Sequence, residues 1–368
     1  MSLSLAALKA QRSWSPGGGR DSLALLKPWM SPVSVHHIPE LALAGGATLR
    51  GVRIAWQSYG RLSPAADNAI LVTHGLTSSH LAAEPPTLDR RIGWGADQIG
   101  PGLLYDTDRY FVISTNVLGS AYGSTCAADL NPATGRPWGP DFPAVTMEDV
   151  VAAQADLVDS LGIRRLKAVA GCSLGGFQAY QWAVSFPERM EKIIATDTAA
   201  HDSFDLGQAI PGLLDRFAAH PAWANGSYTP GALVTALTDL RAEMLKGFGI
   251  MVKLAALAPD LPRQEALLRA EAEDWARLFD PWTLVSMYRT AASFDVRDRL
   301  HLIRAPVLIV MADTDEWYPP SVGRALEAAL RRAKVPVTYH EVKSALGHYA
   351  TTEEPWKWVA VARAFLER

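Results

Sequence analysis

The sequence predicts an α/β fold, in which a mostly parallel sheet is flanked by helices and interrupted by a helical insertion. Three observations carry this prediction. Short apolar runs bounded by turn residues recur along the chain, as is typical of strands buried on both faces of a parallel sheet. Segments with helical periodicity lie between some of these runs. The runs then stop over residues 201–296 and return near the C-terminus.

Each element follows from a local pattern. Residues 33–60 alternate short β-type segments around a glycine-rich turn, which predicts an antiparallel pair. Thr146 and Asp149 have the spacing of a capping box, so a helix is expected after Thr146 and ends at Gly162. The buried strands are expected at 69–73, 110–115, 166–170, 192–196, 306–312 and 337–342, and further helices at 233–245, 263–279 and 322–333.

These elements divide the chain into three parts. Residues 1–32 include a Pro-Gly-Gly-Gly segment and are expected to form an N-terminal arm. Residues 33–200 and 297–368 are expected to form the α/β core. Residues 201–296 are expected to form a helical lid over it.

Composition excludes several classes of protein. The chain of 368 residues has 35 Lys and Arg against 38 Asp and Glu, a balance that argues against a nucleic-acid partner. Its two cysteines are too few for a disulfide scaffold or a Cys-based zinc site. The N-terminus lacks a signal-peptide pattern, and the longest apolar runs have half the length of a membrane helix. The sequence therefore predicts a cytoplasmic protein with no membrane partner.

The strongest chemical signal is the segment Gly171-Cys172-Ser173-Leu174-Gly175-Gly176. It lies between a predicted strand and a helical segment, which is the setting of a nucleophile elbow. Glycines are needed at 171 and 175, because side chains there would collide in so tight a turn. Ser173 is the candidate nucleophile, and the helix that begins behind it favours negative charge on an attacking oxygen.

A serine nucleophile needs a histidine base and an acid that orients the histidine. Asp315 follows the predicted strand 306–312, and His348 follows the strand 337–342, so both lie at strand ends where open sheets place their sites. Asp315 is preferred to Asp313 because Pro319 follows it by four residues, and His348 is preferred to His340 because His340 lies within a strand.

The tetrahedral intermediate of acyl transfer needs backbone N–H donors. One is expected from Leu174, directly after the nucleophile, and the other from Leu76 in the loop after strand 69–73. His74 in the same loop competes for a catalytic role, but it is interpreted as a structural residue of the loop.

The chain resembles the homoserine O-acetyltransferase family in order from about residue 33 to the C-terminus. The matching segments are His74-Gly75-Leu76-Thr77, Asn116-Val117-Leu118-Gly119, Gly123-Ser124-Thr125, Asn131-Pro132-Ala133-Thr134-Gly135, Asp141-Phe142-Pro143, the elbow at 171–176, Thr314-Asp315 with Tyr318-Pro319-Pro320, and Gly347-His348. The resemblance implies an α/β-hydrolase fold with a helical lid, a Ser-His-Asp triad, a ping-pong acyl-enzyme and a homodimer formed through the lid.

The chain also departs from the family pattern in the candidate substrate pocket, for which Asn116, Arg241 and Tyr349 are the candidate residues. The family has an Asp for the homoserine ammonium directly after the catalytic His, where this chain has Tyr349. A family Arg for the homoserine carboxylate corresponds to Arg241 by counting or to Glu243 by the Ala-x-Met pattern. The family Tyr seven residues later is replaced by Phe248 or Ile250.

These departures predict an enzyme with a complete acyl-enzyme machinery and a weakened amino-acid site. The expected function is therefore a serine ester hydrolase that acts on small acetyl-type esters. The alternative is an O-acetyltransferase that uses acetyl-CoA to acylate homoserine or another alcohol, and a catalytically inactive binding protein ranks third. No cofactor or metal is expected, since the sequence has no H-E-x-x-H, Walker or G-x-G-x-x-G motif.

Overall fold

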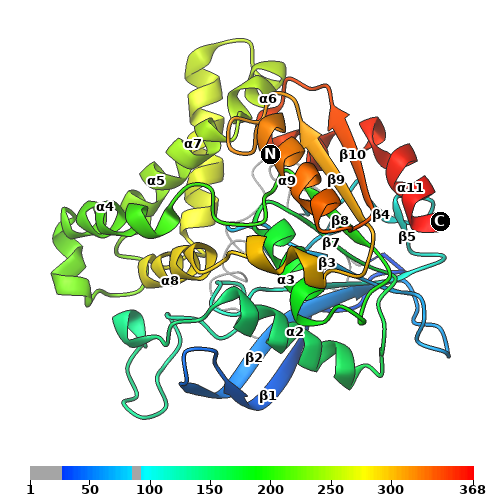
Figure 1. The fold of residues 1–368 in the computed structure, drawn as a ribbon. Coiled ribbons are helices and arrows are strands. Elements are labelled where there is room, and N and C mark those ends of the chain that lie inside the picture. Colours follow the sequence, from blue (N-terminus) through cyan, green and yellow to red (C-terminus); the bar gives the residue numbers. More distant parts are fainter. Residues whose placement is uncertain (1–26, 85–92) are drawn as a thin grey trace.

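The computed structural model describes residues 27–84 and 93–368 and contains a central eight-stranded sheet (Figure 1). The strand order is β1-β2-β6-β3-β7-β8-β9-β10, with β1 and β2 antiparallel to each other and β2 antiparallel to β6. All other neighbours are parallel. The strands span Ser34–Ala42 (β1), Thr48–Tyr59 (β2), Ala69–Thr73 (β3), Phe111–Thr115 (β6), Ala168–Cys172 (β7), Ile193–Thr196 (β8), Val307–Ala312 (β9) and Val337–Val342 (β10). The mostly parallel sheet predicted from the sequence is confirmed.

Helices cover both faces of the sheet. Alternate residues of β9 pack into two different apolar clusters: Ile309 contacts the cluster that includes α2, α3 and α9, and Leu308 contacts the cluster that includes α11. This alternation explains why the central strands are continuous apolar runs. The core helices span Met147–Ser160 (α2), Leu174–Ser185 (α3), Pro320–Arg332 (α9), Ala350–Glu353 (α10) and Val359–Glu367 (α11).

The capping box predicted at Thr146 is present. The Thr146 side chain accepts from the Asp149 amide, and the Asp149 carboxylate accepts from the Thr146 amide. Strand β7 begins at Ala168, two residues after the start of its apolar run, because Leu166 forms only an isolated bridge with Met190.

Between β8 and β9 the chain forms the helical insertion, which we define as residues 201–296. Its helices span Leu206–Ala218 (α4), Val234–Gly247 (α5), Ile250–Leu257 (α6), Leu261–Ala276 (α7) and Pro281–Ala292 (α8). The Asp202 amide donates to the Phe294 carbonyl and the Val296 amide to the Ala200 carbonyl, so the chain leaves and re-enters the core at one place. The insertion extends to one side of the sheet and encloses apolar clusters of its own (Figure 1).

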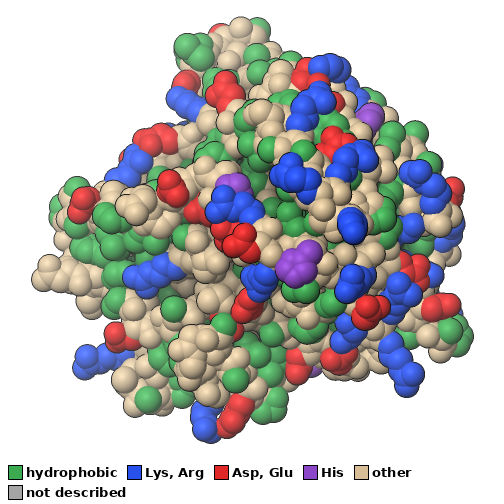
Figure 2. All heavy atoms as spheres, in the orientation of Figure 1, with side chains coloured by type: hydrophobic (Ala, Val, Ile, Leu, Met, Phe, Trp, Pro, Cys, Tyr) green, Lys and Arg blue, Asp and Glu red, His purple; other side chains and the backbone are tan. Residues whose placement is uncertain are grey.

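The face shown in Figure 2 carries both acidic and basic side chains. Among the residues that the structure describes, every helix is too short or too polar to cross a bilayer. Most of the segment assigned to the N-terminal arm, residues 1–26, lies outside the described residues.

Candidate active site

Ser173 lies in a sharp turn between β7 and α3. Its φ of 57° and ψ of −124° fall in a region that residues with side chains rarely adopt, at a cost of about 1–3 kcal/mol. Neighbouring elements hold this backbone in place. The Ser173 amide donates to the Thr196 carbonyl at 3.0 Å, and the Thr198 hydroxyl donates to the Ser173 carbonyl at 2.7 Å. The turn therefore presents the Ser173 side chain at the carboxyl edge of the sheet.

The glycines of the elbow are required by close packing. A Cβ at Gly171 would lie 2.3 Å from the Gly175 carbonyl carbon, and a Cβ at Gly175 would lie 2.1 Å from the Thr73 carbonyl oxygen. A Cβ at Gly176 would lie 2.3 Å from the Thr198 methyl group. The collision expected from the sequence at 171 and 175 is thus present in the structure.

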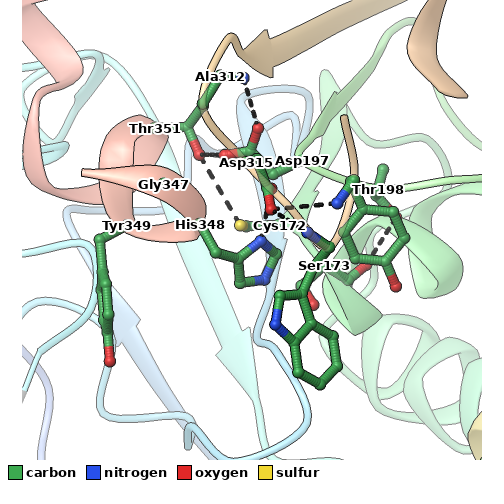
Figure 3. Close-up of polar contacts among 12 residues, drawn as sticks. Cys172, Ser173, Asp197, Thr198, Ala312, Asp315, Gly347, His348, Tyr349 and Thr351 are labelled. Carbon is green, nitrogen blue, oxygen red and sulfur yellow. Dashed lines mark hydrogen bonds and ion pairs between the residues drawn. The ribbon is translucent and has the colours of Figure 1, made fainter. Parts of the chain in front are cut away.

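His348 and Asp315 form a hydrogen-bonded pair. His348 Nδ1 is 2.7 Å from Asp315 Oδ2, and the Asp315 side chain is fully buried. Asp315 Oδ1 accepts from the amides of Trp317 and Tyr318, which fixes the carboxylate. In the view of Figure 3 the imidazole lies between Asp315 and Ser173. With Nδ1 bonded to Asp315, Nε2 is the atom that can exchange a proton with Ser173.

Burial lowers the pKa of His348, but the charge and hydrogen bond of Asp315, together with the charge of Asp197, outweigh burial and raise it overall. This environment stabilises an imidazolium, which is the species formed when the histidine accepts the proton of Ser173.

The two competing residues lie in other settings. Asp313 accepts from the Ser344 amide at 2.9 Å and lies 3.4 Å from the Lys343 ammonium, so it anchors the loop that leads to His348. His340 lies in β10, with its Nε2 3.3 Å from the Lys357 carbonyl oxygen. Neither is paired with a member of the candidate triad.

The loop after β3 lies against the nucleophile, since a Cβ at Gly75 would be 3.7 Å from Ser173 Cβ. Leu76 follows in this loop, and Leu174 is the first residue of α3, where amides lack partners within the helix. His74 is fully buried. Its Nδ1 lies 2.8 Å from the Gly75 carbonyl oxygen and its Nε2 accepts from the Val117 amide. Burial lowers the pKa of His74 to about 4, so this histidine is neutral. Its hydrogen bonds stabilise the loop.

Arg241 of α5 reaches from the insertion to the same loop. Its guanidinium donates to the Thr77 hydroxyl at 2.9 Å and lies 5.3 Å from the centre of the Trp275 ring and 5.8 Å from that of Phe248. The Phe248 ring in turn lies 5.2 Å from the imidazole of His348. Arg241 and Phe248 thus correspond to the first of the two registers left open by the sequence.

Glu243, the alternative in that comparison, lies away from the site. It is exposed on α5 and forms an ion pair with Arg216 of α4. Tyr349 lies in the site region, with its ring 6.2 Å from that of Phe248. Its hydroxyl is buried without a hydrogen-bond partner among the described residues, and burial raises the pKa of the phenol. Tyr349 is therefore neutral at physiological pH.

Asn116, the third candidate for the substrate pocket, is fully buried at the end of β6. Its side-chain amide nitrogen donates to the Ala121 carbonyl at 2.5 Å, and its backbone carbonyl oxygen accepts from the Ser124 hydroxyl. In this position Asn116 fixes the loop that follows β6.

Sequence reasoning missed two features of the site. Trp317 and Tyr318 place aromatic rings 6.4 and 5.6 Å from the imidazole of His348, although their position directly after Asp315 could have indicated this. Asp197 is a second buried carboxyl group near His348 and Asp315. The sequence pattern that could have indicated Asp197 is an acidic residue directly after a buried strand.

The strand order and the site define the class of this protein. Residues 68–355 match the family model described as alpha/beta hydrolase fold, which confirms the predicted α/β-hydrolase fold. The chain is 35% identical to the homoserine O-succinyltransferase of Bordetella pertussis, over 92% of this chain and 88% of that protein. It is 34% identical to the homoserine O-acetyltransferase of Geotalea uraniireducens, over 91% and 96% of the two chains. The chain therefore belongs to the homoserine O-acyltransferase family of the α/β hydrolases.

Solved structures agree with the α/β-hydrolase fold. The structure of esterase E22 has a TM-score of 0.82 at 26% identity and covers 92% of this chain and 100% of its own. The homoserine O-acetyltransferase from Bacillus anthracis has a TM-score of 0.83 at 24% identity, over 93% and 99% of the two chains, and supports the fold alone. The protein is thus an enzyme related to acyltransferases and hydrolases.

Proposed function

We propose that this protein is a serine-dependent O-acyltransferase that moves a short acyl group from a thioester to the hydroxyl of a small carboxylate-bearing alcohol. The sequence predicts an ester hydrolase first and, second, an O-acetyltransferase that uses acetyl-CoA to acylate homoserine or another alcohol. The relatives at 34–35% identity, which are named homoserine O-succinyltransferase and homoserine O-acetyltransferase, favour the transferase.

The proposed chemistry begins at Ser173. His348 Nε2 takes the Ser173 proton as the oxygen attacks the acyl carbonyl, and the same proton then passes to the leaving thiolate. The amides of Leu76 and Leu174 donate to the oxyanion of each tetrahedral intermediate. The acceptor hydroxyl then gives its proton to His348 and attacks the acyl-Ser173 ester. Collapse of the second intermediate returns the proton to Ser173 and releases the new ester.

The chemical class of the acceptor is inferred from the surroundings of Arg241. Its guanidinium lies at the oxyanion loop, forms no ion pair with any described residue, and has a buried Nε without a hydrogen-bond partner. A partly buried cation without a counterion is costly, so a binding partner with negative charge is expected there. A carboxylate suits a guanidinium because it accepts two parallel hydrogen bonds. An acceptor with a hydroxyl at one end and a carboxylate at the other meets this requirement.

Ester hydrolysis is the second candidate function, and Tyr349 favours it. A neutral phenol follows His348 where the resembled family has a carboxylate for an ammonium group. An acceptor ammonium therefore lacks a charged partner at this position, and water can take the place of a poorly bound acceptor. The likeness to esterase E22 at 26% identity supports the same candidate.

A panel of four acceptors separates these functions. Homoserine carries both charges, 4-hydroxybutyrate lacks the ammonium, 3-aminopropanol lacks the carboxylate and 1-propanol lacks both. With acetyl-CoA or succinyl-CoA as donor, we expect homoserine and 4-hydroxybutyrate to be acylated at least tenfold faster than 3-aminopropanol and 1-propanol. Equal rates for all four would contradict a carboxylate site at Arg241. Hydrolysis of p-nitrophenyl acetate, measured in parallel, gives the rate of the water reaction.

A further inference from the structure

Asp197 lies directly after β8, between the two segments that carry Asp315 and His348. Its Oδ1 accepts from the Ala312 amide at 2.7 Å, at the end of the strand that leads to Asp315. Its Oδ2 accepts at 2.6 Å from the hydroxyl of Thr351, which lies in helix α10 three residues after His348. Figure 3 shows both contacts beside the candidate triad. One carboxyl group therefore joins the segment of the acid to the segment of the base.

The backbone of Asp197 indicates that this position is held under strain. Its φ is 44°, in the left-handed region, and its amide donates to the Val310 carbonyl at 2.9 Å. The side chain is fully buried. Strained backbone that the surroundings hold in place is concentrated at functional sites.

The electrostatics of this position connect Asp197 to the base. Burial, and then the charge of Asp315, raise the pKa of Asp197, whereas the charge of His348 lowers it. In return the charge of Asp197 contributes to the raised pKa of His348. The other titratable groups facing this cluster are Cys172 and Tyr318, and burial raises the pKa of both, so both stay neutral.

We propose that Asp197 is a second acid of the active site, a positioning residue that fixes the Asp315 and His348 segments relative to each other and adds negative charge at the imidazole. Asp197 touches neither Ser173 nor the acyl group in this account. It acts through His348, and its effect is the same whether water or an alcohol accepts the acyl group. The inference rests on the proposed triad.

Four substitutions separate charge from position. Asp197→Asn keeps an oxygen for the Ala312 amide and an amide group for the Thr351 oxygen, so it removes the charge and retains both connections. Asp197→Ala removes charge and connections together. Thr351→Val removes the connection to α10, and Thr351→Ser restores the hydroxyl.

The direct readout is the pKa of His348, measured by NMR titration in a Ser173→Ala background, where no turnover is needed. We expect Asp197→Asn to lower this pKa and to move the acidic limb of the kcat/KM profile of the Ser173-containing enzyme to lower pH. Asp197→Ala and Thr351→Val should reduce kcat by about tenfold or more, because small displacements of catalytic groups have large effects, and Thr351→Ser should recover most of it.

A merely structural role would lower the melting temperature and leave the His348 titration where it is, and that result would overturn the proposal. An unchanged kcat in Asp197→Ala would overturn it as well. Failure of the proposed triad is recognised separately, because Ser173→Ala would then retain activity whatever Asp197 does.

Discussion

The guanidinium of Arg241 on helix α5 donates to the hydroxyl of Thr77, two residues after Gly75 in the loop that lies against Ser173. A charged group of the insertion thereby reaches the region where the oxyanion is expected to form. In the proposed function this contact links acceptor recognition to the acylation chemistry, and it leads to the first prediction.

Arg241→Met should raise the KM for a carboxylate-bearing acceptor by about 10- to 100-fold, since a hydrogen bond to a charged group contributes roughly 1.5–3 kcal/mol. Hydrolysis of p-nitrophenyl acetate, which has no carboxylate, should change much less. Arg216→Met is the matched control, because Arg216 forms an ion pair with Glu243 on the surface. Steady-state kinetics with both substrates test the prediction, and equal losses on both substrates in Arg241→Met would count against it.

Ser173→Ala and His348→Ala should each lower kcat by several orders of magnitude, because they remove the nucleophile and the base. Folding should be retained, which a melting curve checks. Labelling by a fluorophosphonate, detected by mass spectrometry at the Ser173 peptide, gives an independent readout. Near-normal activity in either variant would refute the triad.

Asp315→Asn should reduce kcat by about 10³- to 10⁴-fold, as expected for the loss of the residue that orients and charges the histidine. Asp313→Asn should have a milder effect, because Asp313 accepts from the Ser344 amide and pairs with Lys343 rather than His348. The two variants differ only in which acid is neutralised, so the ranking of their kcat values is decisive. The reverse ranking would assign the acid to Asp313.

The activity should depend on a histidine whose pKa is above the usual value of about 6.5, since Asp315 and Asp197 stabilise the imidazolium of His348. Catalysis needs the neutral imidazole, so kcat/KM should fall as the pH decreases through this raised value. His340→Gln, which changes a histidine of β10, should leave the midpoint in place. A midpoint below 6.5 in the wild-type enzyme would disagree with the described site.

The tip of the insertion exposes apolar side chains that we propose form a homodimer interface. Val252 and Leu257 of α6 are 46% and 66% exposed, and Leu261 and Leu267 of α7 are 61% and 37% exposed. Exposed apolar side chains that form a contiguous patch mark interaction sites. Light scattering should give the mass of a dimer, and Leu257→Lys with Leu261→Lys should reduce it to that of a monomer. Trp356→Lys, at a 64% exposed position outside the insertion, is the control. A monomeric wild-type protein would refute this interface.

The sheet and the candidate triad could be predicted from the sequence, because Ser173, Asp315 and His348 each follow a recognisable strand. Carboxyl ends of parallel strands meet at one edge of a sheet, so chain order alone brought these residues together. Helix α4 was harder to recognise, since Pro211 lies inside it and proline normally ends a helix.

The residues of the candidate substrate pocket could not be assigned from the sequence alone, because their positions depend on tertiary packing that no local sequence pattern encodes. Sequence comparison left Arg241 and Glu243 as alternatives, and only the placement of α5 over the loop after β3 distinguishes them. Asp197 follows a buried strand, which is a local signal for a site residue, but its partners could not be predicted from the sequence. Its role depends on contacts with Ala312 and Thr351, both of which lie more than a hundred residues further along the chain.

The most direct test of the central claim is the fate of the acyl group when the enzyme is given acetyl-CoA or succinyl-CoA and a carboxylate-bearing alcohol in water. Mass spectrometry can measure the ratio of O-acylated homoserine or 4-hydroxybutyrate to the free acid. We expect the O-acyl product to exceed the free acid and Arg241→Met to reverse this ratio. Free acid as the sole product, at a rate unaffected by either acceptor, would contradict the transferase and leave an ester hydrolase.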